Sequence, residues 1–164
     1  MCGVVAGRYP PAPMRIRSEV VELPAERVRR VLTGLPQAAG YRVMIKPLRY
    51  RQKPHLSAWT DFDGHEIVLQ VPEPFFPFGE IVPYAAKRRP GKGMRFIWLT
   101  EGVTFRTPRE VLRFLYLHEF MHWYLWERLG KKAAAETACD RFALANYRRR
   151  VVTEDDADAA LVRR

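Results

Sequence analysis

Two histidines lie four residues apart in residues 116–124, YLHEFMHWY, and a glutamate directly follows the first of them. On an α-helix, His118 and His122 project from the same face one turn apart, so both imidazoles can reach one metal ion. Glu119 is rotated by about 100° around that helix, where it can reach a water bound to the ion. This spacing is the HExxH pattern, which predicts zinc held by the two histidines and Glu119 as the general base.

An ordinary apolar helix is the alternative interpretation, because the residues around these three polar side chains are all uncharged. The chain has only four histidines, however, so a chance HExxH is rare. The uncharged neighbours also suit a zinc helix, which needs apolar packing on the sides that face away from a cleft. We therefore predict a metal site in this helix.

A tetrahedral catalytic zinc needs a third protein ligand and one open position. Glu136 and Asp140 are four residues apart downstream and share a helical face. If the two helices fold back on each other, Glu136 approaches the histidines as third ligand, and Asp140 accepts the second ring N–H of one histidine. Three alternatives stay open: Asp140 is itself the ligand, Glu127 takes that place, or both acids are solvated surface residues.

The helix that carries the histidines has a clear start and a clear end in the sequence. Residues 107–110, TPRE, form a capping box with proline at the first helical position. Gly130 is a natural terminator, so the helix is expected to run to about Leu129. A second helix is predicted from about residue 132 to 150, and Thr153 begins a short, frayed third one.

Upstream, the hydrophobic period changes from helical to alternating. A helix is predicted at 24–35. Strands are predicted at 41–46, 56–60, 65–71, 81–85 and 94–100, separated by a DFDG turn at 61–64, a Pro/Phe loop at 72–77 and a basic turn at 88–93.

The order of these elements is a helix, several strands and then two consecutive helices, which favours an α+β fold over alternating α/β. We expect a small, twisted, mostly antiparallel sheet. Residues 1–17 are expected to be a flexible arm, 18–152 a single domain, and 153–164 a tail or short helix. The strand at 94–100 precedes the metal helix, so we expect it to form the edge of the cleft and to pair with an extended peptide.

The segment HEFMH followed by ETACD resembles the HExxH…ExxxD pattern of gluzincin metallopeptidases. The following DRFALANY resembles the corresponding part of the small ImmA/IrrE-like peptidases, or minigluzincins, which bacteria and phages commonly encode. The resemblance is close over 107–150 and extends only to the order of elements over 24–100. It implies a zincin-like fold, with His118, His122 and Glu136 as ligands and Glu119 as base.

These residues predict a zinc metalloendopeptidase that hydrolyses peptide bonds of a protein substrate. Glu119 would take a proton from a zinc-activated water and pass it to the leaving amine. The oxyanion partner is not defined by the sequence, and Tyr147, His65 and His55 are candidates by residue type alone. Two other hypotheses are a zinc hydrolase of non-peptide substrates and a basic, nucleic-acid-associated protein with a structural or inactive metal site.

The composition fits one globular domain, because the chain has 164 residues, 48% of them hydrophobic and 28% charged. No apolar run approaches the length of a membrane span, and no secretory signal is apparent. Cys2 and Cys139 form no disulfide framework, so we expect a reducing compartment, most simply the cytoplasm. We also expect a monomer. The net charge of +10 is either a solvated arginine-rich surface or a contact with nucleic acid.

Overall fold

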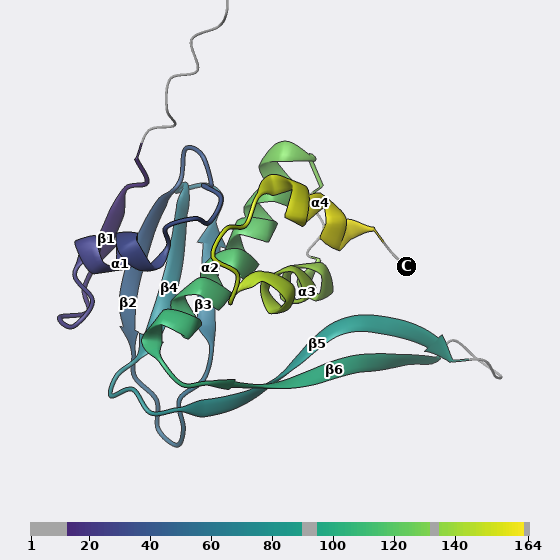
Figure 1. The fold of residues 1–164 in the computed structure, drawn as a ribbon, viewed down its shortest axis with the longest axis horizontal. Helices are drawn as coiled ribbons and strands as arrows, with labels where there is room; N and C mark the ends of the chain where they lie inside the picture. Colours follow the sequence, from purple (N-terminus) through teal and green to yellow (C-terminus); the bar gives the residue numbers. More distant parts are fainter. Residues whose placement is uncertain (1–12, 90–94, 132–134, 163–164) are drawn as a thin grey trace, which may run out of the picture.

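The computed structural model describes residues 13–89, 95–131 and 135–162 of the chain. Strands dominate its first part and helices its last part, so the predicted α+β class is confirmed (Figure 1). The elements in chain order are β1 Ile16–Ser18, α1 Ala25–Val31, β2 Arg42–Leu48, β3 Ser57–Asp61, β4 Glu66–Pro72, β5 Phe78–Arg89, β6 Arg95–Phe105, α2 Pro108–Trp123, a π-helical turn η1 Tyr124–Arg128, α3 Glu136–Asn146 and α4 Glu154–Leu161.

Four strands form the main sheet in the order β1-β2-β4-β3. β1 pairs with β2 and β2 with β4 in parallel, and only β3 pairs with β4 in antiparallel fashion. The prediction of a mostly antiparallel sheet was therefore wrong for these strands. The helix α1 links β1 to β2, which is the kind of crossover that parallel neighbours need. The boundary predicted for the arm at residue 17 is wrong, because Ile16 and Arg17 lie in β1. Residues 1–12 lie outside the described residues.

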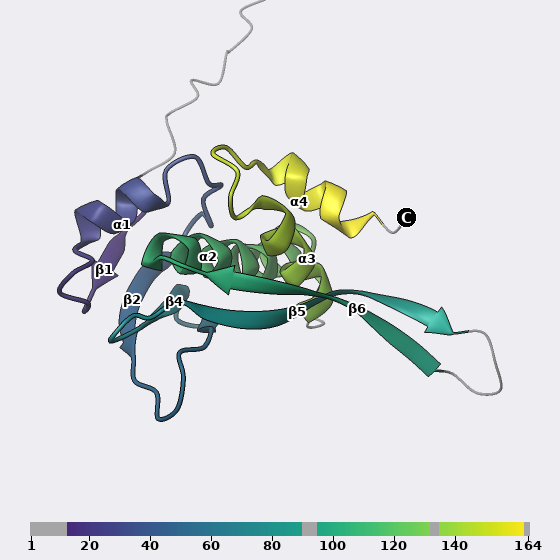
Figure 2. The ribbon, with the colours of Figure 1, turned by 60° about the horizontal axis from the view of Figure 1, so that its bottom comes forward.

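The β3–β4 hairpin agrees with the predicted DFDG turn, in which the Gly64 amide donates to the Asp61 carboxylate at 2.9 Å. β5 and β6 pair with each other in a separate two-stranded ribbon, from Phe78 opposite Phe105 to Arg89 opposite Arg95. Both strands are longer than predicted, and residues 88–89 of the predicted basic turn belong to β5. Residues 90–93 of that turn and residue 94 of the predicted strand lie outside the described residues. One end of the ribbon extends away from the rest of the domain (Figures 1 and 2).

The helix α2 is the centre of the fold, packed against β3 and β4 on one side and against α3 on the other (Figure 1). It begins at Pro108 as predicted, and the Glu110 amide donates to the Thr107 hydroxyl at 3.3 Å. The second half of the predicted capping box differs, because the Glu110 carboxylate accepts from the Arg106 amide at 3.1 Å and not from the Thr107 amide. The α-helix ends at Trp123, earlier than predicted, and continues through η1 to Gly130, which has a positive φ of 62°. Because α2 is apolar on nearly all sides, the core surrounds it.

The last two helices, α3 and α4, lie within the ranges predicted for them. α3 covers the middle of the helix predicted at 132–150, and residues 132–134 lie outside the described residues. α4 follows Thr153 with its capping carboxylate at Asp156, as predicted. Among the described residues, no helix has the length and apolarity that crossing a membrane requires.

Candidate metal centre

α2 presents two histidine side chains to the same place. The Nε2 atoms of His118 and His122 are 3.2 Å apart, and their ring centroids are separated by 5.0 Å. Both side chains are largely buried, with 14% and 15% of their surface exposed. The spacing of four residues therefore produces the convergence that the helical period predicts.

Glu136, the first residue of α3, reaches both histidines. Its Oε2 is 3.0 Å from Nε2 of His118, and its Oε1 is 2.9 Å from Nε2 of His122. Ligand atoms on a tetrahedral zinc ion are separated by about 3.3 Å, given metal–ligand distances near 2.0–2.1 Å. The three donor groups lie within about 0.4 Å of that separation, and two imidazoles with one carboxylate are a donor set that zinc binds.

Asp140 contacts the other side of the first histidine. Its Oδ1 is 2.8 Å from Nδ1 of His118, so the carboxylate can accept the Nδ1–H and leave the Nε2 lone pair facing Glu136. This contact opposes the alternative in which Asp140 is itself a ligand. Glu127 is not placed as a ligand either, because it lies on η1 and accepts a hydrogen bond of 2.8 Å from the Tyr41 hydroxyl.

Cys139 offers a second set of donors. Its Sγ and a ring nitrogen from each of His118 and His122 lie within 4.8 Å of one another, so this group could also hold a metal ion. A tetrahedral site would need an S···N separation of about 3.6 Å, and the oxygens of Glu136 are already at ligand spacing. The thiol is fully buried and does not line the cavity, whereas Glu136 does. The geometry therefore favours Glu136.

Glu119 is buried beside the histidines, with 4% of the residue exposed. Its Oε1 is 3.9 Å from Nε2 of His118, and its Oε2 accepts a hydrogen bond of 2.7 Å from the Thr60 hydroxyl. Burial raises the pKa of Glu119, while the nearby His118 and the Thr60 hydrogen bond act in the opposite direction. A carboxylate with a raised pKa next to a metal position is suited to accept and return a proton.

Thr60 was not among the residues singled out in the sequence. It lies on β3, and 59 positions separate it from Glu119, so no sequence spacing connects the two. The pairing of the sheet and the packing of α2 against β3 bring them together. The sequence would have indicated this threonine only if the edge position of β3 next to the metal helix had been known.

The carboxylates around the histidines favour positive charge at this position. Burial by itself lowers the pKa of His118, but hydrogen bonds to Asp140 and Glu136 outweigh burial and raise it to about 10. The hydrogen bond to His118 in turn lowers the pKa of Glu136. A divalent cation between these side chains would supply the same charge, which is a second indication that the donor set fits a metal ion.

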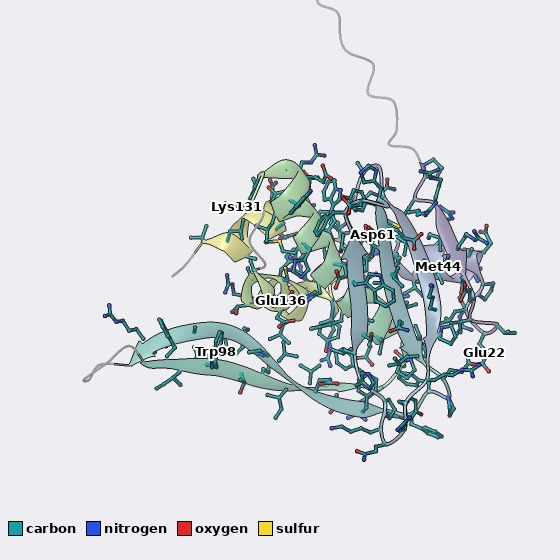
Figure 3. All side chains as sticks on the ribbon, turned by 180° about the vertical axis from the view of Figure 1, so that it is seen from behind. Glu22, Met44, Asp61, Trp98, Lys131 and Glu136 are labelled. Carbon is teal, nitrogen blue, oxygen red and sulfur yellow. The ribbon has the colours of Figure 1, made fainter. Side chains whose placement is uncertain are left out.

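A cavity of about 310 Å³ opens onto these side chains. The edge strand β3 forms one wall, and the stacked rings of Phe62 and Trp126, 4.5 Å apart, contribute to its lining. Lys131 also lines it (Glu136 and Lys131 are labelled in Figure 3). The remaining lining residues are Ala58, Trp59, Thr60, His118, Glu119, His122, Leu125 and Glu136.

The three oxyanion candidates named from the sequence do not line this cavity. His65 is exposed next to the Tyr41 ring, and His55 is exposed before β3. Tyr147 is buried against the aromatic rings of Phe105 and Phe114. Residue type suggested them, but which face each side chain occupies depends on packing that the sequence does not show.

The predicted cleft edge is also corrected by the structure. No residue of 95–100 lines the cavity, because β6 belongs to the separate ribbon. β3 takes that position instead, as the outermost strand of the main sheet. Comparisons of the chain with protein-family models, with curated proteins and with solved structures found no match. The geometry of the site is therefore the basis for any functional conclusion.

Proposed function

We propose that this protein is a zinc-dependent metalloendopeptidase of the gluzincin type. One observation carries the proposal: Glu136 lies 2.9–3.0 Å from the Nε2 atoms of His118 and His122, next to the buried Glu119. The three donors would hold zinc, and Glu119 would act as the general base. This arrangement agrees with the resemblance to minigluzincins over residues 107–150.

Bound zinc would supply Lewis acidity to the scissile carbonyl and lower the pKa of a water molecule to about 7. Glu119 would accept a proton from the attacking water while the water oxygen bonds to the carbonyl carbon, and would return that proton to the amide nitrogen as the C–N bond breaks. Thr60 holds one carboxylate oxygen of Glu119, which leaves the other oriented towards the histidines. Asp140 fixes the ring orientation of His118.

An extended segment of a protein is the substrate that the cavity suits best. β3 pairs with β4 on one side, and its other edge is unpaired among the described strands. An extended peptide can add to that edge and run along the cavity wall, which is how sheet edges commonly capture peptides. Trp59, 43% exposed, and the Phe62–Trp126 pair would contact apolar side chains of the substrate.

A purely structural or inactive metal site is the competing hypothesis, and a zinc hydrolase of non-peptide substrates is a third. A closed structural site has four protein ligands and no use for a buried base such as Glu119. We also infer a reducing, cytoplasmic location, for which the support is the free and fully buried Cys139.

The substitution Glu119→Gln tests the catalytic role. We expect the variant to keep stoichiometric zinc, measured by elemental analysis, and to lose at least about 100-fold of the cleavage rate on an unfolded protein, because a general base contributes about 10²–10⁴-fold. Glu127→Gln is the matched control, since this acid binds Tyr41 outside the cavity and should leave the rate unchanged.

Two results would contradict the proposal. One is a Glu119→Gln variant that cleaves as fast as the unsubstituted protein. The other is a purified protein without stoichiometric zinc whose melting temperature is unaffected by added zinc, both before and after His118→Ala. The first result would remove Glu119 from its role as general base, and the second would also exclude the two competing hypotheses, because both require bound metal.

A further inference from the structure

The end of the β5–β6 ribbon that extends from the domain is uncovered on both faces. We call residues 85–89 and 95–99 the outer ribbon (Trp98 is labelled in Figure 3). Four consecutive large apolar residues of β6 are exposed: Phe96 by 55%, Ile97 by 46%, Trp98 by 57% and Leu99 by 38%. Successive residues of a strand point to opposite faces, so neither face is packed against the domain there. Exposed apolar surface of this kind marks an interaction site.

The two aromatic rings of the outer ribbon share one face. Phe96 and Trp98 are two residues apart on β6, which separates them by about 7 Å along the strand. Their cross-strand neighbours on β5 are Arg88 and Ala86, respectively. The small alanine leaves the Trp98 ring accessible, and the arginine places a cation beside Phe96. Two accessible rings in a row suit the stacking of successive unpaired bases.

The charge of this segment selects for a polyanion. Residues 84–100 contain five lysines and arginines and no aspartate or glutamate. Lys87 and Arg88 are exposed, and neither forms an ion pair within the described part of the chain. Cations without acidic partners are available to phosphate groups, and the chain's net charge of +10 adds long-range attraction.

The order of charges and rings along the ribbon argues against insertion into a membrane. Lys87 lies opposite Ile97 and Arg88 lies opposite Phe96, so these cations are level with the apolar side chains and not behind them. A hairpin that inserts its end into a bilayer needs apolar residues at that end, with cations behind them at the headgroups. Duplex DNA fits less well too, because its stacked bases offer no free faces to Phe96 and Trp98.

We propose that the outer ribbon binds single-stranded nucleic acid, with phosphates at Lys87 and Arg88 and bases on Phe96 and Trp98. This inference is independent of the proposed peptidase activity, because no ribbon residue lines the cavity. If both hold, the ribbon would deliver the peptidase to proteins bound on single-stranded nucleic acid.

Fluorescence anisotropy with the full chain tests the proposal. The probes are labelled oligothymidine and oligouridine of about 30 nucleotides and a duplex of the same length, titrated between about 50 and 200 mM salt. We expect the single strands to bind at least about tenfold more tightly than the duplex. The double variant Phe96→Ala/Trp98→Ala should weaken that binding at least about tenfold without changing its salt dependence.

Two further variants separate the contribution of the cations from that of the aromatic rings. Lys87→Ala/Arg88→Ala should weaken binding and reduce the magnitude of the salt slope by about one to two. Phe76→Ala is the matched control, because this aromatic residue is 58% exposed outside the ribbon, and its removal should change nothing. All of these side chains are exposed, so circular dichroism and the melting temperature should stay as in the unsubstituted protein.

Several results would overturn the proposal. They are tighter binding of duplex than of single strands, unchanged single-strand binding in Phe96→Ala/Trp98→Ala, or no single-strand binding at the lower salt concentration. Ribbon-dependent sedimentation with vesicles of phosphatidylserine and phosphatidylcholine, together with the absence of nucleic-acid binding, would assign the outer ribbon to membrane surfaces instead. A comparison of oligothymidine with oligouridine distinguishes DNA from RNA.

Discussion

Glu136 and Cys139 compete for one position next to the two histidines. They lie almost one turn apart on α3, so both face α2. The carboxylate oxygens lie 2.9–3.0 Å from the imidazole nitrogens and face the cavity, whereas the thiol is fully buried. A cavity-facing carboxylate leaves the open coordination position that hydrolysis needs, and a buried thiolate would instead draw the ion into the core.

Substitution of each residue separates these two ligand sets. We expect Glu136→Ala to weaken zinc affinity at least about 100-fold, since loss of a ligand costs more than the roughly 10–100-fold of an outer-shell partner. Cys139→Ser should retain the affinity within about threefold. Zinc affinity is measured by competition with a chelating dye, and the cobalt form should lack near-ultraviolet thiolate absorption. A thiolate band that disappears in Cys139→Ser would identify the cysteine as the ligand.

Among the residues of the site, sequence spacing predicts contacts only between side chains of the same helix. His118 and His122 converge because the helical period places them on one face. Glu136 comes from another helix, so its approach required the additional assumption of a fold-back, which the contacts between α2 and α3 support. Thr60 comes from a strand and depends on sheet order, for which the sequence carries no spacing signal.

Element boundaries follow the same distinction between local and distant causes. The starts of α2 and α4 were predictable because capping is local: Thr107 and Thr153 each precede an acid by three residues. Strand direction and strand length were not. The ribbon strands extend well beyond 81–85 and 94–100 because they pair with each other. β2 is parallel to β4 because the chain passes through β3, which is antiparallel to β4, before it reaches β4.

The cap of α4 gives a prediction about pH. The Asp156 carboxylate accepts hydrogen bonds from the Thr153 amide at 2.8 Å and from Arg149 at 2.9 Å, and the amide contact is the main reason why its pKa is lowered. A carboxylate with a lowered pKa stabilises the fold above its unfolded-state pKa, near 3.9. That contribution is lost as the pH falls through the still lower folded-state value.

Asp156→Asn should therefore reduce the free energy of unfolding by about 1 kcal/mol at pH 7 and by much less at about pH 2. Urea denaturation at both pH values measures the difference. Asp155→Asn serves as control, because Asp155 is exposed in the same turn of α4 and makes no capping contact among the described residues. An equal loss for Asp156→Asn at both pH values would exclude the carboxylate's charge as the cause.

Across the whole molecule, one buried junction ties the helical layer together. Arg113 of α2 is 3% exposed, and its guanidinium donates to the carbonyls of Val31, Thr33, Tyr147 and Arg149. These acceptors lie after α1 or at its end, and after α3, so one side chain joins three segments. Burial lowers the pKa of Arg113, and the carbonyl oxygens compensate for the lost hydration of the charge.

Gly34 allows the chain to approach itself closely at the same junction. Its carbonyl accepts a hydrogen bond of 2.9 Å from the Val152 amide, and a Cβ atom at Gly34 would lie 2.2 Å from the Arg150 carbonyl oxygen. That neighbour is backbone and cannot rotate aside. Gly34 also has a positive φ of 87°, a conformation that costs a residue with a side chain about 1–2 kcal/mol.

Gly34→Ala and Gly40→Ala form a matched pair that isolates this close approach. Gly40 has a similar φ of 82°, but no atom lies within 4 Å of a Cβ built there. Both substitutions carry the backbone cost, and only Gly34→Ala must also separate two segments of the chain, which adds about 1–3 kcal/mol. We expect urea denaturation to show that difference between the two variants. Equal losses of stability would mean that the junction tolerates expansion and that backbone strain alone explains the requirement for glycine.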